Sequence, residues 1–107
     1  MKLCIVLSTN HAETNWSAFR LANLAISKGD VVSIFLTGEG VEYNKNSSDR
    51  FNINEQVQRF LQSTNTNIIG CGTCMAIRNQ KGSKECPEGG IEDLYRLIAE
   101  NDKVITF

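Results

Sequence analysis

Apolar residues follow two different patterns along this chain. Residues 2–7, 31–36 and 67–70 are short, nearly continuous apolar runs, which are typical of strands buried on both faces of a sheet. Between and after them, apolar residues recur every three or four positions, which is typical of amphipathic helices. This second pattern predicts helices over residues 14–27, from Asn52 onward, at 75–78 and over 91–100, before a last strand at 104–107.

Strands and helices therefore alternate, which predicts an α/β fold: a three-layer α/β/α sandwich around a mainly parallel sheet of four or five strands. The number of strands depends on residues 85–88, which are expected as a short edge strand or only a turn, because Pro87 is excluded from a sheet interior. A chain of 107 residues has the length of one domain.

Side-chain chemistry at the helix ends supports these boundaries. Asn10 or Thr14 is expected to cap the first helix, and Gly29 fits the position just after it. Asn52 and Glu55 have the spacing of a capping box. The faces expected to point inward carry Ala18, Leu21, Ala22 and Ala25 in the first helix, Ile53, Val57, Phe60 and Leu61 in the second, and Ile91, Leu94, Leu97 and Ile98 in the last.

Composition narrows the functional classes. Net charge is −1 and no basic block is present, so nucleic acid is not an expected partner. No apolar segment is long enough to span a membrane, and the first apolar run is too short for a signal peptide. We therefore expect a cytoplasmic protein, whose four cysteines are thiols, metal ligands or redox groups rather than structural disulfides.

The pair Cys71 and Cys74 is the strongest chemical signal. The two thiols stand where a buried strand passes into a helix, at the edge of a parallel sheet where ligands and catalytic groups gather. A thiolate is favoured there by helix N–H groups. We expect Cys71 to be the more reactive thiol and Cys74 to resolve its adduct, to tune its pKa or to pack inward.

Weaker candidates lie on neighbouring loops. His11 follows the first strand and would stabilise a thiolate or serve only as a surface histidine. The loop Gly38, Glu39 and Gly40 follows the second strand, where glycines permit close backbone approach to substrate or to another subunit. Cys86 is expected to be exposed, as a bystander or as a third relay thiol, and Cys4 is expected in the core.

Four stretches of the chain together resemble the DsrE/DsrF-like sulfur-relay family. Residues 32–41 resemble its second strand and loop, residues 71–78 its cysteine loop and following helix, and residues 93–95 and 102–107 its ending. Arg78 stands seven residues after Cys71, which is the spacing to the active cysteine in family members with a single one. Asn79 departs from the family, which usually has glycine there.

The resemblance implies a single DsrE-like domain over residues 1–107, with a five-stranded parallel sheet. It also implies a homotrimer or homohexamer, for which the loop 38–43 and the first helix are candidate contacts. The implied activity is that of a sulfurtransferase-like sulfur carrier, which accepts sulfur as a persulfide on Cys71 and passes it from a donor protein to an acceptor protein. Arg78 would belong to the same site, and no metal or other cofactor is implied.

Three alternatives remain open. A zinc module would use Cys71, Cys74 and Cys86 with His11 or Cys4, although the usual zinc signature has two close pairs and only one is present. A thioredoxin-like oxidoreductase would need a cis-proline facing the motif, for which Pro87 is the only candidate. A noncatalytic oligomeric scaffold would keep the fold and have unreactive thiols.

Overall fold

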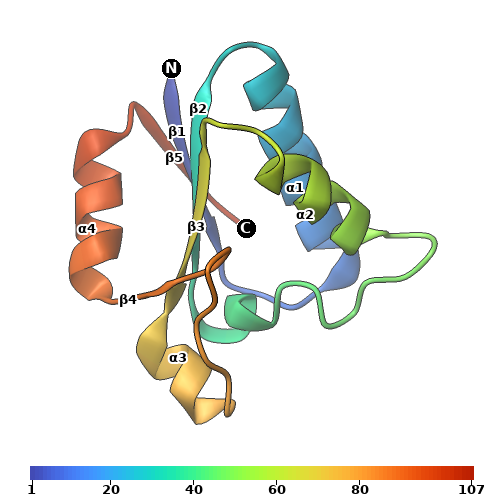
Figure 1. The fold of residues 1–107 in the computed structure, drawn as a ribbon, viewed down its shortest axis with the longest axis vertical. Coiled ribbons are helices and arrows are strands. Elements are labelled where there is room, and N and C mark those ends of the chain that lie inside the picture. Colours follow the sequence, from blue (N-terminus) through green and yellow to red (C-terminus); the bar gives the residue numbers. More distant parts are fainter.

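A computed structural model describes all 107 residues as a five-stranded parallel sheet with helices on both faces (Figure 1). The strands lie in the order β4-β3-β2-β1-β5. Their bounds are β1 Lys2–Leu7, β2 Val31–Leu36, β3 Thr66–Cys71, β4 Glu88–Gly89 and β5 Lys103–Thr106. The helices are α1 Ala12–Ser27, α2 Ile53–Leu61, α3 Gly72–Ile77 and α4 Ile91–Glu100, with a 3₁₀ helix, η1, at Gly38–Glu42.

The three predicted layers are present. Helices α1 and α2 cover one face of the sheet and α4 covers the other, while α3 extends beyond the end of β3 (Figure 1). The fifth strand is β4, a two-residue edge strand that pairs with the end of β3. It follows Pro87 directly, which agrees with the prediction that proline confines this segment to an edge.

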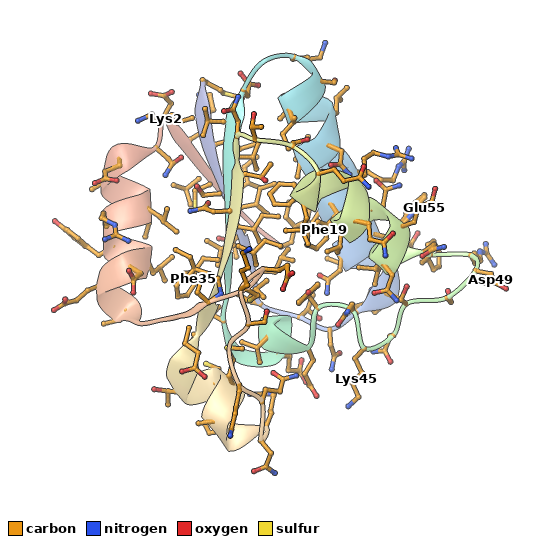
Figure 2. All side chains as sticks on the ribbon, in the orientation of Figure 1. Lys2, Phe19, Phe35, Lys45, Asp49 and Glu55 are labelled. Carbon is orange, nitrogen blue, oxygen red and sulfur yellow. The ribbon has the colours of Figure 1, made fainter.

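The hydrophobic core is divided unequally by the sheet. Seventeen buried residues, Phe19 among them, form the larger part, which includes the inner faces of α1 and α2. Four form the smaller part: Cys4, Val6, Phe35 and Leu97. Figure 2 shows Phe19 and Phe35 on opposite sides of the sheet. Cys4 is fully buried, as predicted.

Helix α4 buries less of its surface than its sequence predicts. Leu97 is buried and Leu94 partly buried, but Ile91 is 78 % exposed and Ile98 is 50 % exposed. The prediction that both isoleucines point inward is therefore wrong. The predicted helix is present. However, α4 is the single helix on this face of the sheet, and the strip of its surface that contacts the sheet is narrower than the strip of apolar residues along it.

The helix ends explain several local choices of residue. His11, rather than Asn10 or Thr14, is the N-cap of α1, and its Nδ1 accepts a hydrogen bond from the Thr14 N–H. Asn52 caps α2 as predicted, since its side chain accepts from the Glu55 N–H at 3.1 Å.

None of the helices combines the length and the hydrophobicity that crossing a membrane requires.

Helix α3 ends in a Schellman motif, which accounts for Asn79. The N–H groups of Asn79 and Gln80 donate to the carbonyls of Ala76 and Met75, at 3.1 and 2.8 Å. This geometry needs a left-handed residue, and Asn79 has φ +57°. Asparagine is among the few non-glycine residues that adopt this conformation readily, so it can end the helix in this way.

Candidate functional site

The candidate site forms where β2 and β3 end side by side. These strands are parallel neighbours, with Leu36 beside Gly70 in the register. Their carboxyl ends therefore bring Thr37 and Gly38 next to the turn from Cys71 into α3. This is the sheet edge at which ligands bind in open α/β folds, and it unites two motifs that the sequence analysis identified separately.

Cys74 is held by the loop after β2. Its Sγ accepts a hydrogen bond from the Gly38 N–H at 3.2 Å. Gly38 adopts φ +54°, a left-handed conformation that glycine reaches without the strain a side chain would add. The side chains of Cys71 and Thr37 also lower the pKa of this thiol. Cys74 is partly exposed.

Arg78 is anchored beside the pair. Its Nη1 donates to the Cys74 carbonyl at 3.1 Å, and its Nε lies 3.4 Å from Glu42 Oε1. Glu42 is in turn contacted by Asn10 Nδ2 at 3.3 Å and by Lys45 Nζ at 3.4 Å. The guanidinium is therefore oriented by a carboxylate that is itself fixed by two other side chains.

The two thiols differ in acidity. The pKa of Cys74 lies below its ordinary value, chiefly because Cys71 and then the Gly38 N–H hydrogen-bond its sulfur, with smaller contributions from Thr37 and the positive charge of Arg78. Burial raises the pKa of Cys71, and the adjacent Cys74 raises it further. Of the pair, Cys74 is thus the thiol that ionises more readily.

Cys71 occupies the junction itself, as predicted. It is the last residue of β3 and the N-cap of α3. Its side chain is partly buried and packs against both parts of the core. Directly before it, Gly70 leaves space for neighbouring sulfurs: a Cβ there would lie 2.8 Å from Met75 Sδ and 3.4 Å from Cys86 Sγ.

The other candidates on the loops differ in their surroundings. His11 is exposed, and its ring nitrogen bonds to Thr14 at the start of α1. Glu39 is exposed on η1. Gly40 is buried against the end of β1, where a Cβ would overlap the Leu7 carbonyl oxygen. The close approach at Gly40 is made to β1 of the same chain, and approach of this loop to a substrate or another subunit stays a prediction.

Cys86 is buried, which corrects the prediction that it is an exposed bystander. Only 8 % of it is exposed, and burial raises the pKa of its thiol. The segment before β4 folds back over β3. It is closed by two reciprocal hydrogen bonds: the Ser83 N–H donates to the Cys86 carbonyl, and the Cys86 N–H donates to the Ser83 hydroxyl oxygen. Serine three residues before Cys86 is the signal that the sequence analysis did not use.

The structure does not assemble the residues that a zinc site or a thioredoxin-like site would need. No group of three or more histidine, cysteine, aspartate or glutamate side chains is arranged to hold a metal ion, so the five zinc candidates are not brought together. Pro87 has a trans peptide bond and differs from the cis-proline that a thioredoxin-like site requires. The sequence analysis missed Thr37 and Glu42, because their roles depend on which strands are neighbours.

The thiol pair lies on an open part of the surface. The molecule has five surface hollows, and neither Cys71 nor Cys74 lines any of them. The nearest in sequence has a volume of about 260 Å³ and includes Met75 and Cys86 in its lining. Both reactive candidates are partly exposed.

Comparison with known proteins agrees with the geometry. The crystal structure of the YchN protein from E. coli superposes with a TM-score of 0.80 over 100 % of both chains, at 19 % sequence identity, which establishes a shared fold. No curated protein sequence matches significantly. The model of the DsrE/DsrF-like family matches residues 1–107, the whole chain. The protein is therefore a member of the DsrE/DsrF-like family.

Proposed function

We propose that this protein is a sulfur carrier of a sulfur relay, which holds sulfur as a cysteine persulfide on the Cys71 and Cys74 pair. The observation that carries the proposal is the environment of Cys74, whose sulfur receives the Gly38 N–H and lies near Arg78. A stabilised, accessible thiolate is what sulfur transfer needs, because its rate depends on thiolate fraction and access. Membership of the DsrE/DsrF-like family supports the same role.

The donor and acceptor are proposed to be proteins. The pair is partly exposed at the end of the sheet and lies outside the lined hollows of the surface. A persulfide presented on another protein's surface can approach such a site directly, and so can the acceptor thiol. A cytoplasmic location, with its reduced thiol pool, fits the four free cysteines.

We also propose a homo-oligomer, a trimer or hexamer, in which α4 and β5 form the contact. Ile91 and Tyr95 are 78 % and 73 % exposed on α4. Val104 is 39 % exposed on β5, which is an unpaired sheet edge, and it lies beside Cys4, on the face of the sheet that α4 covers. An apolar helix face beside an open strand edge is a surface that native proteins usually cover.

The direct test is sulfur loading followed by mass spectrometry. The protein is incubated with a cysteine desulfurase and cysteine, and peptides are mapped without reduction. A mass gain of one sulfur atom on the peptide containing Cys71 and Cys74 is the expected result. Absence of the gain with every persulfide donor tested would remove the proposal, and reversible oxidation of the pair with insulin-reducing activity would favour a thiol–disulfide oxidoreductase instead.

A further inference from the structure

The two cysteines of the pair have unequal surroundings. Cys74 receives a backbone N–H from Gly38, a residue on a different strand's loop, and faces the Thr37 hydroxyl. Cys71 packs against apolar side chains from both parts of the core. The backbone N–H groups of Thr73 and Cys74 also favour a negative Cys71 sulfur, but burial raises the pKa of Cys71 overall, so the balance favours the second cysteine of the motif.

Arg78 adds to this asymmetry. Its Nη1 donates a hydrogen bond to the backbone carbonyl of Cys74 at 3.1 Å. Its positive charge also lowers the pKa of the Cys74 thiol. Glu42, half-buried beneath it, prevents the guanidinium from moving freely because it binds Nε. Two segments therefore meet at Cys74: the Gly38 N–H at the start of η1 contacts its sulfur, and Arg78 at the end of α3 contacts its carbonyl oxygen.

We propose that Cys74, positioned by Gly38, is the thiol that first attacks the donor and carries the incoming sulfur, and that Cys71 is the second thiol. This deepens the proposed function and rests on it. It assigns the pair in the order opposite to that expected from the spacing to Arg78, which remains a prediction that the same experiment tests.

The loading step balances without an added oxidant. The Cys74 thiolate attacks the outer sulfur of a donor persulfide, and a bond forms between Cys74 Sγ and that sulfur. The donor's sulfur–sulfur bond breaks, and its inner sulfur leaves with the electron pair as a thiolate, which takes up a proton. The sulfane sulfur and its oxidation state pass together from donor to Cys74.

When no acceptor is present, Cys71 resolves the persulfide on Cys74. Its thiol, after losing its proton, attacks Cys74 Sγ, the inner sulfur. A Cys71–Cys74 disulfide forms, the persulfide bond breaks, and the outer sulfur leaves as hydrosulfide. With an acceptor present, the acceptor thiolate instead attacks the outer sulfur, and Cys74 returns to its thiolate form.

The first experiment compares single-turnover loading of the intact protein, Cys71→Ser and Cys74→Ser with glutathione persulfide as the probe. We expect Cys71→Ser to load at a rate close to that of the intact protein and to keep its adduct longer, while Cys74→Ser loads at least about tenfold more slowly. Faster loading of Cys74→Ser than of Cys71→Ser, or equal rates in the two, would overturn the order but leave the carrier function standing. No adduct in the intact protein would instead remove the carrier function.

The second experiment tests Gly38 with a matched control. Gly38 and Gly29 both have positive φ, +54° and +90°, and a Cβ at either meets no atom within 4 Å. Gly38→Ala and Gly29→Ala therefore both impose backbone strain alone. The first variant lies beside Cys74, and the second lies just after the end of α1. The readout is the pH profile of Cys74 alkylation by iodoacetamide, measured in the Cys71→Ser background.

We expect Gly38→Ala to raise the apparent pKa of Cys74 and Gly29→Ala to leave it unchanged. Each unit of increase lowers the loading rate at neutral pH by about threefold, since a tenfold loss of thiolate is partly offset by higher intrinsic nucleophilicity. Thr37→Val, which removes a hydroxyl without strain on Gly38, is expected to shift the pKa in the same direction. Unshifted profiles in both Gly38→Ala and Thr37→Val would overturn the positioning role.

Discussion

The backbone N–H of Gly38 donates a hydrogen bond to the sulfur of Cys74, although the two residues lie thirty-six positions apart in the sequence. The contact exists because β2 and β3 are parallel neighbours and end at the same edge. It joins the glycine-containing loop and the cysteine pair in one site, and the chemical consequences of that site are open to direct measurement.

Cys74 should react as a thiolate at lower pH than an ordinary cysteine. The largest contribution to its lowered pKa comes from the side chain of Cys71, so the pKa of Cys74 depends on which residue replaces Cys71. Serine keeps a donor there and alanine does not. We expect the alkylation midpoint of Cys74 to lie at lower pH in Cys71→Ser than in Cys71→Ala, as followed by iodoacetamide kinetics. Equal midpoints would show that Cys71 is not the donor.

Arg78→Gln should reduce the acidity of Cys74 with little loss of stability. The substitution removes the positive charge that favours the thiolate. Because the ion pair with Glu42 is partly exposed, its loss is expected to cost at most about 1 kcal/mol of unfolding free energy. Alkylation pH profiles and urea unfolding measure the two effects. Arg59→Gln, at an exposed ion pair on α2, is the control and should leave the alkylation profile unchanged.

Gly40→Ala should destabilise the fold. Its Cβ would overlap the Leu7 carbonyl, which is backbone and cannot rotate away. We expect a loss of at least about 1–3 kcal/mol, the usual cost of overpacking, together with displacement of η1. Gly90→Ala is the control, because a Cβ there meets nothing within 4 Å. Thermal unfolding compares the two, and similar melting temperatures would contradict the prediction.

Cys4→Ser should affect stability rather than sulfur loading. Cys4 is fully buried in β1, on the side of the sheet that α4 covers. A serine hydroxyl left without a partner there costs about 1–3 kcal/mol. Chemical unfolding should show this loss, while the mass gain after incubation with the desulfurase stays as in the intact protein. Unchanged stability with lost loading would assign Cys4 to the site.

The proposed oligomer should depend on the exposed face of α4. Light scattering at micromolar concentration is expected to give a trimer or hexamer, and Tyr95→Lys is expected to shift it toward monomer. Ile77→Lys is the matched control, since Ile77 is 73 % exposed on α3, which follows β3 and not the edge strand β5. A monomeric intact protein would refute the oligomer, and dissociation by Ile77→Lys alone would relocate the interface.

Local sequence patterns predicted most of the strands and helices and the position of the thiol pair. Residues 2–7 and 31–36 match β1 and β2 because a strand buried on both faces needs a continuous apolar run, which is a local property. The start of α2 at Asn52 follows equally from a bond between near neighbours. The placement of Cys71 at a strand–helix junction required only these local patterns.

Contacts between segments distant in sequence follow from the tertiary structure and not from local patterns. The Gly38 N–H meets Cys74 because of the strand order, and Cys86 is buried because the segment before β4 folds back over β3. Ile91 and Ile98 share the helical periodicity of Leu97 yet remain exposed. Periodicity reports which residues lie on one side of a helix, whereas burial depends on how much of that side the neighbouring layer covers.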